Sequence, residues 1–494
     1  MIAVTPILPN LNDLSYAQKD ELIAALFAQV QSLSAQQALL IARIAQLEGR
    51  LALNSKNSSK PPSSDGLNKP APKSLRLSGQ KPSGGQKGHS GSTLRQSAQV
   101  DETVAHQADS RCRVCQCEML DHEVAETRQV FELPALRIRT IAHQQMCSTC
   151  TCGAVHLGAW PEGVNAPAQY GASVKAASVH LNQHHLTPLA RTAALMQDLH
   201  GVRLSQASIQ SFAQDAARLL RPTVAAIGRA VQGAGVVNAD ETGIRVKGKL
   251  HWLHCAVTLT LTWLAPHARR GTLAFEALGL LQGIKGVLVP GGLASYKGLQ
   301  CTHSLCNAHH IRELVYIDEQ ENEKIWDPWA QQMIALLLQA LKEVAVAAGP
   351  LDGQRQAWFE AQWSELLERG EALNPQTGRT GSSSWTHDAG TGARGRPKQS
   401  KAANLLKRLR EYRCDVWRFM TDEGVPFTNN LAEQALRMAK VKQKISGCFR
   451  TEHGADTFFT IRSYLATMAK QKANLFDCLI SVFDRQPIQP RFAG

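Results

Sequence analysis

A strict alternation of three- and four-residue steps between apolar side chains is the feature that most limits what this chain can fold into. The repeat runs from Ile23 to Leu51, with leucine at every d position and β-branched residues at three of the five a positions. This pattern favours a parallel two-stranded coiled coil, whose register Gln37 at an a position would fix at some cost in stability. An amphipathic helix packed on its own domain is the alternative. We expect residues 17–53 to form a leucine zipper that makes the chain a homodimer.

The segment after the heptads has a composition that excludes a packed core. Residues 54–100 are rich in Ser, Pro and Gly and carry many Lys and Arg residues, so we expect a basic flexible linker. It is either a solvated spacer or an arm that follows DNA. The chain of 494 residues has a formal net charge of +13, which favours a polyanionic partner. It has no apolar run of about 18 residues and no signal-peptide pattern, so we expect a cytoplasmic protein without a membrane segment.

Cysteines are concentrated in one short part of the chain. Six of the twelve lie between residues 112 and 152, where two C-x-x-C pairs are joined by a short β-rich segment, residues 130–145. In a reducing compartment this spacing predicts a tetrahedral zinc ion in a small module over residues 101–160. Four thiolates would close the coordination sphere, so this zinc is expected to be structural. The economical ligand set is Cys112, Cys115, Cys147 and Cys150, with Cys117 and Cys152 as alternative ligands.

The middle of the chain changes from a helical to a β pattern. Residues 163–232 carry apolar positions at helical spacing, with a break at LHGVRLS where Ser205 is a candidate N-cap. Two helices separated in this way are typical of a DNA-binding helix-turn-helix, or of plain helical packing. From Gly235 onward, runs rich in Val, Leu, Thr and Trp give a β-β-β-α-β order, which predicts a sheet of mixed strand direction. Helices are expected again from residue 311, interrupted by a loop over residues 374–400.

Two acidic residues stand where such a fold could present them to one cation. Asp240 is expected at the carboxyl end of the first strand, and Glu433 near the start of a late helix. Mg²⁺ prefers oxygen ligands, and two ions about 3.5–4 Å apart can activate a nucleophile and stabilise a leaving oxygen in phosphoryl transfer. Each acid alone is more often a solvated or capping residue. The apolar positions of the late helix leave Glu433 on a different face; they are Leu431, Ala435 and Met438.

Four long stretches of the sequence resemble one known protein family. They read NADETGIRV, YKGLQCTHSLCNAHHIREL, RGRPKQSKAANLLKRLREY and VPFTNNLAEQALRMAKVKQKISGCFRT. They resemble transposases of insertion sequence family sixty-six (TnpC type), and the resemblance covers nearly the whole chain. It implies a multidomain α+β protein with a coiled coil, a small zinc-binding module, a helical domain and an RNase H-like α/β catalytic core. This core would span residues 235–448 with a helical insertion at about 311–410, followed by a C-terminal element over residues 449–494.

The resemblance also implies a mechanism. It implies that an Asp-Asp-Glu triad holds two Mg²⁺ (or Mn²⁺) ions, cuts the ends of a transposon and joins them to target DNA. Asp240 matches the first acid and Glu433 the third. The second acid is expected in a His-Asp-Gly triplet, but those positions are Pro290, Gly291 and Gly292 in this chain.

The missing middle acid leaves two functions open. The chain is either a transposase that cuts and joins DNA, or a catalytically inactive DNA-binding dimer derived from one. Glu241 should point to the opposite face of the strand, while Asp318 and Glu319 do not lie on a strand, so none of them is a good substitute. The resemblance implies that the partners are the terminal repeats and target DNA; whether accessory proteins of the same element are also needed stays open. It places the protein in the bacterial cytoplasm, associated with the nucleoid.

The remaining candidate residues are a C-x-x-H pair and two basic groups. Cys306 and His309 match a family motif, and they are either zinc ligands, a packed thiol with a hydrogen-bonded imidazole, or, for His309, a group near the scissile phosphate. The first basic group has the form of a minor-groove hook, although phosphate contact is the simpler interpretation. The second follows Glu433 on its helix and would hold DNA beside the acids, or else form a solvated helix face. The two groups are Arg394, Arg396 and Lys398, and Lys440, Lys442 and Lys444.

Overall fold

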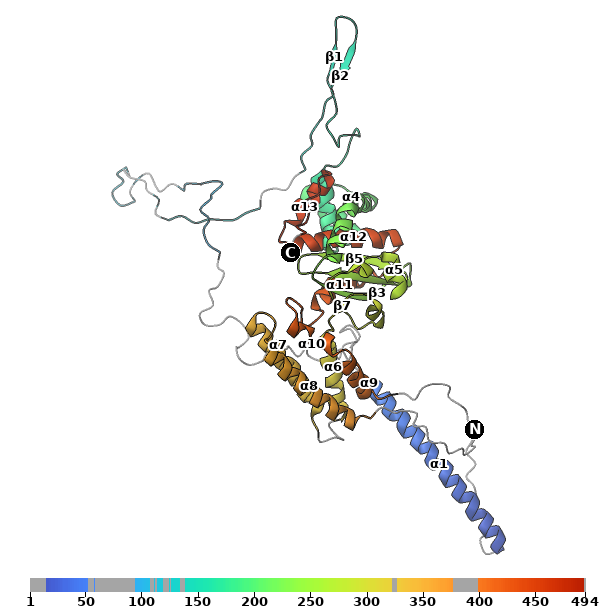
Figure 1. Cartoon of the computed structure of the whole chain (residues 1–494). Helices are drawn as coiled ribbons and strands as arrows, with labels where there is room; N and C mark the ends of the chain where they lie inside the picture. Colours follow the sequence, from blue (N-terminus) through green and yellow to red (C-terminus); the bar gives the residue numbers. More distant parts are fainter. Residues whose placement is uncertain are drawn as a thin grey trace. The chain divides into compact units, whose positions relative to one another are not determined.

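A computed structural model gives the fold of two compact units (Figure 1). One unit comprises residues 1–70, 161–192 and 205–494, and the other comprises residues 71–160 and 193–204. The structure describes residues 15–51, 57, 94–106, 111, 113–118, 124, 126–133, 138–321, 327–375 and 399–492.

The heptad repeat forms a single long helix. Helix α1 (Tyr16–Leu51) is 36 residues long and contains every heptad position from Ile23 onward. Its core-forming side chains are exposed in the single chain; Leu33 and Leu40, for example, are 56% and 64% exposed. A continuous exposed apolar stripe of this kind is what a coiled-coil partner would cover.

The cysteine-rich segment contains a small hairpin, strands β1 (Cys147–Thr149) and β2 (Val155–Leu157), which pair antiparallel. The turn between them is closed by hydrogen bonds from Cys150 N to Ala154 O (2.8 Å) and from Gly153 N to Cys150 O (2.9 Å). The expectation of β structure over residues 130–145 is wrong for the part of that segment that the structure describes, which contains no strand. The apolar side chains described there are exposed, so they pack against no neighbouring strand. A β-like pattern does not form a strand by itself when no partner strand is present.

A five-stranded mixed sheet lies at the centre of the larger unit. Its order is β5-β4-β3-β6-β7, with β3, β4 and β5 antiparallel and β6 and β7 parallel to β3. Helix α5 (Thr272–Leu278) and the 3₁₀ turn η4 (Leu281–Gly283) connect β5 to β6, so the predicted β-β-β-α-β order and mixed direction are confirmed. The strands are β3 (Val236–Val246), β4 (Lys249–Val257), β5 (Thr262–His267), β6 (Val287–Pro290) and β7 (Thr302–His303).

The first strand extends further than its sequence suggested. We expected Asp240 to end it, but β3 continues to Val246 and pairs with β4 along its whole second half. A tight turn at Lys247 and Gly248, both with positive φ (51° and 74°), joins the two strands, as two-residue hairpins require. The parallel strand β6 does end beside this position: its last residue, Pro290, pairs with Ala239.

Helices cover both faces of this sheet, and alternate residues of β3 face opposite sides. One face packs against α4 (Gln206–Gln232), where Ile227 and Val231 meet Val237 and Ala239. The other face packs against α11 (Asn430–Ser446) and α12 (Glu452–Lys470) (Figure 1). The even-numbered residues of β3, Asp240 among them, therefore face α11.

The predicted helical middle and C-terminal regions are also present. Ser205 is the N-cap of α4, as expected, because its side chain accepts a hydrogen bond from Ser208 N at 2.9 Å. The other helical elements here are α2 (Ala172–Val179), the π-helical turn η3 (His180–His184), α3 (Leu189–His200) and α13 (Leu475–Phe483). No helix in the described part of the chain is both long enough and apolar enough to cross a membrane.

The helices between β7 and α11 have an aromatic core of their own, built around Trp329, Trp363, Trp417 and Phe359. Val289 of β6 belongs to the same core and joins it to the sheet. The helices are α6 (Asn307–Glu321), α7 (Trp329–Ala347), α8 (Gly353–Leu373), α9 (Lys401–Glu411) and α10 (Arg413–Thr421), and a short 3₁₀ turn, η5 (Ala294–Gly298), follows β6.

Candidate active site

The parallel pairing of β3 with β6 puts Gly291 directly beside Asp240. Ala239 pairs with Pro290, and Gly291 N donates a hydrogen bond to Ala239 O at 2.8 Å. A Cβ atom built on Gly291 would lie 2.3 Å from Asp240 Oδ1 and 2.9 Å from its Cγ. The carboxyl group of Asp240 therefore occupies the space that a side chain at position 291 would need.

The surroundings of Asp240 disfavour the ionised form of its carboxyl group. Burial raises its pKa to about 7, and the negative charges of Glu241 and Glu433 act in the same direction. A hydrogen bond of 2.8 Å from Glu241 N to Oδ1, together with the charge of Arg270, opposes this rise only in part. At neutral pH the carboxyl group is thus protonated in a large fraction of molecules.

Asn429 fixes the start of α11 against the strand that carries Asp240. This buried side chain donates from Nδ2 to Ala239 O and accepts from Asn238 Nδ2, both at 2.9 Å. Its backbone N–H also points to Cys306 Sγ at 3.2 Å. Sequence analysis missed this residue: an Asn before a helix normally suggests a cap, but this side chain bonds the sheet and does not cap the helix.

Glu433 lies one turn into α11, half-buried, with its N–H bonded to Asn429 O at 3.2 Å. Its charge raises the pKa of Asp240 and contributes to the raised pKa of Cys306, so Glu433 is close enough to interact electrostatically with both groups. The fully buried face of α11 differs from the expected one. It consists of Ala432, Leu436 and Ala439, while the expected Leu431, Ala435 and Met438 are partly buried beside it.

Comparison with protein families decides the ancestry of this arrangement. The family model described as "Transposase IS66 family" matches residues 167–457, which is more than half of the chain. The chain belongs to the IS66 transposase family. Residues 6–95 separately match a family of unknown function (DUF6444), and a comparison with curated proteins finds no match.

Glu241 does not replace the middle acid of this IS66 transposase. Its side chain is 2% exposed and faces away from Asp240, as expected. One carboxylate oxygen accepts from Arg270 Nη2 (2.7 Å) and Nε (3.1 Å), and the other accepts from the hydroxyl of Tyr296 (2.7 Å). Glu241 is thus a buried anchor that ties η5 to β3.

Asp318 and Glu319 also lie elsewhere, near the end of α6, and Asp318 accepts a hydrogen bond from Gln331 of α7. Among the described residues, no group of three or more His, Cys, Asp or Glu side chains is placed to hold a metal ion. The described residues of this IS66 transposase therefore do not supply the grouped ligands of a two-ion centre, and the Asp240 carboxyl group lies in the space that a side chain at position 291 would need.

The C-x-x-H pair resembles packed core groups more than ligands. Cys306 is buried, its sulfur faces Asn429 N, and burial raises the pKa of its thiol. Burial likewise lowers the pKa of His309, whose Nδ1 is buried without a hydrogen-bond partner in the described part of the chain. These observations favour the packed interpretation of Cys306.

The predicted DNA-contacting lysines differ in where they point. Lys440 donates to Gly243 O of β3 at 2.5 Å, and Lys442 lies 5.8 Å above the ring of Phe458. Burial lowers the pKa of both ammonium groups. Lys444 is exposed. Arg394, Arg396, Lys398 and the zinc candidate Cys112 lie outside the described residues, so their roles stay predictions.

The raised pKa of Asp240 makes a prediction about stability. An unfolded Asp titrates near 3.9 and the folded one near 7, so the unfolded state loses its proton first and stability falls as pH rises from about 4 to about 7. We expect Asp240→Asn to raise the melting temperature at pH 8 in a chelator, by about 2–4 °C per kcal/mol regained, and to change little at pH 4. Glu365→Gln, at an exposed position of α8, is the matched control. Equal shifts at both pH values would contradict the assignment.

Proposed function

We propose that this IS66-family transposase binds the ends of its element as a dimer but cuts DNA inefficiently, because its catalytic centre lacks the middle acid. The observation that carries the proposal is the space at Gly291, which the Asp240 carboxyl group fills. The alternative is a chain that cuts and joins DNA by two-metal phosphoryl transfer, which would need a third ligand beside Asp240 and Glu433.

An RNase H-like core is supported by the sheet topology. Three antiparallel strands are followed by a helix and by a strand parallel to the first, and the first acid lies on that first strand. The position of the missing acid lies at the end of the adjacent parallel strand. Glu433 reaches the same region from α11, which Asn429 fastens to the sheet. This arrangement supports a DDE core, in which the three acids would come from the first strand, the strand parallel to it and a later helix.

DNA binding is supported by charge. The chain carries 54 Lys and Arg residues against 41 Asp and Glu residues, and phosphate contacts by such residues supply most sequence-independent affinity. We propose that Lys444 and the segment with Arg394, Arg396 and Lys398 contribute phosphate contacts.

The test measures binding and cutting in one preparation. The full chain is titrated with a duplex carrying one end of the element that encodes it, and with a scrambled duplex, and strand cleavage is then followed with Mg²⁺ or Mn²⁺. We expect the end duplex to bind at least about tenfold more tightly than the scrambled one, with little cleavage. Robust cutting by the natural chain would overturn the inefficient centre, and equal affinity for both duplexes would overturn end recognition.

We propose that α1 forms the dimer interface, because its heptad side chains are exposed in the single chain. Leu33→Lys with Leu40→Lys puts two charges at d positions, where apolar packing holds a coiled coil together, so we expect the solution mass to fall from dimer to monomer. Gln31→Lys with Ala38→Lys adds the same charge at outer positions of the same heptads and should leave the dimer intact. Light scattering coupled to size exclusion measures both; a dimer in the first variant would contradict the zipper.

We propose that a structural zinc ion lies in the cysteine-rich module, with Cys112, Cys115, Cys147 and Cys150 as ligands. The hairpin that carries Cys147 and Cys150 supports this, because it holds two exposed thiols three residues apart, at the start of β1 and in the turn that follows it. We expect about one zinc per chain by elemental analysis, and a loss of most of it in Cys147→Ser with Cys150→Ser. Cys414→Ser with Cys448→Ser, two exposed cysteines elsewhere, is the control. Unchanged zinc content in the first variant would rule out these ligands.

A further inference from the structure

A cavity of about 380 Å³ adjoins position 291. Its walls come from the end of β6, from η5, and from helices α6, α9 and α10, so it is built by segments that lie far apart in the sequence. This volume is in the range of small-molecule sites and suits a ligand of about the size of one nucleotide. The residues that matter for its chemistry are Gly291, Lys297, His309, Arg408 and Tyr412.

Two cations line this cavity. Lys297 is exposed, and its Nζ lies 3.6 Å from the centre of the Tyr412 ring. No carboxylate in the described part of the chain lies within salt-bridge distance of this ammonium group. Arg408 bonds Glu313 through Nη2 at 2.6 Å, which leaves other N–H groups of its guanidinium to a ligand. Partial burial lowers the pKa of Lys297 and the charge of Arg408 lowers it further, while the charges of Glu411 and Asp415 oppose this. A bound anion would relieve the repulsion between Lys297 and Arg408.

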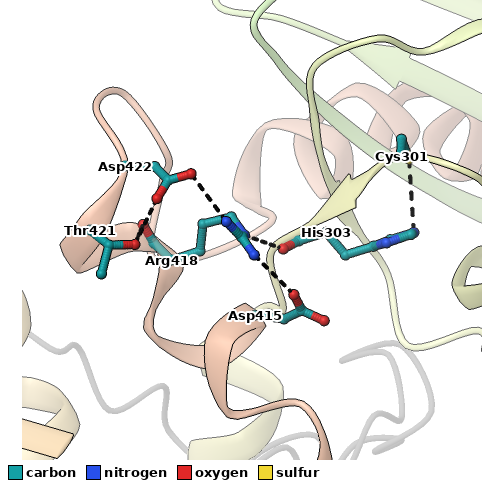
Figure 2. Close-up of polar contacts among 6 residues, drawn as sticks. All are labelled: Cys301, His303, Asp415, Arg418, Thr421 and Asp422. Atoms are coloured by element: carbon teal, nitrogen blue, oxygen red, sulfur yellow. Dashed lines mark hydrogen bonds and ion pairs between the residues drawn. The ribbon is translucent and has the colours of Figure 1, made fainter.

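The two acids that line the cavity are already neutralised. Glu313 is paired with Arg408, and Asp415 lies 3.4 Å from Arg418. Figure 2 shows how Arg418 is held: its guanidinium also bonds Asp422 (3.2 Å) and the backbone oxygen of His303 (2.6 Å). Among the described residues, the ammonium group of Lys297 therefore makes no direct ion pair, and the carboxylates of Glu411 and Asp415 act on it only from a longer distance.

Neutral donors complete the wall. His309 contributes an imidazole whose Nδ1 has no hydrogen-bond partner within the described residues. The ring of His303 is fixed by its Nε2, which lies 3.0 Å from Tyr296 O, with Cys301 Sγ at 3.9 Å (Figure 2). An anion with several acceptor oxygens could therefore meet an ammonium, a guanidinium and an imidazole together.

We propose that this cavity binds one phosphate-bearing nucleotide, with its phosphate on Lys297 and Arg408 and within reach of His309. The proposal rests on the proposed function, since a DNA-binding transposase offers strand-terminal nucleotides beside Asp240. A free nucleotide has the same chemistry and is the other source. The position of the cavity, against Gly291, places such a phosphate at the edge of the candidate active site.

The experiment uses the full chain in a chelator and titrates it calorimetrically. The ligands are a deoxynucleoside 5′-monophosphate, trinucleotides phosphorylated at the 5′ or the 3′ end, their unphosphorylated twin, and inorganic phosphate. We expect a phosphorylated trinucleotide to bind at least about tenfold more tightly than the unphosphorylated one, since a charge-assisted contact contributes about that much. Tight binding of the free nucleotide with no binding of any trinucleotide would identify the free nucleotide as the ligand and overturn the strand-end source.

Variants distinguish phosphate binding in the cavity from non-specific binding to a basic protein. Lys297→Met should abolish the preference for phosphate, Lys297→Arg should keep most of it, and Lys285→Met, at an exposed position outside the cavity, should not change it. An equal preference in Lys297→Met and the natural chain would overturn the proposal. Binding of the element-end duplex is measured in the same preparations. Nucleotide binding without duplex binding would contradict the proposed function alone. Duplex binding without nucleotide binding would contradict the proposed cavity ligand alone.

Discussion

The double variant Pro290→His with Gly291→Asp is expected to cut element-end DNA at least about 10²-fold faster than the natural chain. One preorganised electrostatic group in an active site commonly contributes 10²–10³ in rate, and a carboxylate that bridges two ions should contribute more. Position 291 lies beside Asp240 through the parallel register of β3 and β6, so the new carboxylate would stand where the missing ligand belongs.

The same variant should also bind its metal detectably. The new Cβ forces the Asp240 carboxyl group to rotate, because only 2.3 Å separates their positions, and two neighbouring carboxylates repel each other. We expect a lower melting temperature in a chelator and a recovery with Mn²⁺ that the natural chain lacks. Melting curves with and without Mn²⁺ measure this independently of DNA.

Gly292→Asp is the matched control for this experiment. It adds the same charge one residue away, where a Cβ meets nothing within 4 Å, and it should change neither cutting nor the response to Mn²⁺. If the double variant binds the end duplex normally, responds to Mn²⁺ and still does not cut, the missing acid is not what limits the natural chain.

The second large effect is expected at Asn429. Asn429→Ala removes two side-chain hydrogen bonds. Asn238 Nδ2 then stays buried without its acceptor, while Ala239 O keeps the bond from Gly291 N. An unsatisfied buried polar group costs about 1–3 kcal/mol, so we expect a loss of roughly 2–4 kcal/mol in the free energy of unfolding. The start of α11 should loosen, and Glu433 should then act less on Asp240.

Its neighbour provides the control. Asn430 is the first residue of α11 and is exposed, so Asn430→Ala should change stability by no more than about 0.5 kcal/mol. Urea unfolding followed by circular dichroism compares the two. Similar midpoints for both variants would show that the Asn429 bonds do not hold α11 to the sheet.

Features that depend on local spacing were accessible from the sequence. The heptads gave the long helix α1, and the change from helical to alternating patterns gave the order of the strands in the core. Ser205 was a correct N-cap, and the opposite orientations of Asp240 and Glu241 followed from the two-residue period of a strand. Family motifs predicted that Asp240, Gly291 and Glu433 form one set, and the register of β3 with β6 brings the first two together.

The sequence was a poor guide where long-range packing outweighed a local pattern. The β-rich stretch before Cys147 is without strands in its described part, and β3 did not stop at Asp240. The side chain of Asn429 went to the sheet and not to the helix end. Lys440 and Lys442 contact Gly243 O and the ring of Phe458, and their contact with DNA stays a prediction.

What the sequence by itself determined was therefore the long first helix and the order of the core strands, and a family motif indicated that Gly291 stands where a second acid is expected, because periodicity and motifs are local. Only the tertiary structure decided that Asp240 fills the gap at Gly291, that Asn429 fastens α11, and that a cavity with Lys297 and Arg408 in its wall adjoins Gly291. These depend on strand register and on which distant segments pack together, and long-range packing fixes both because one register alone buries the apolar faces.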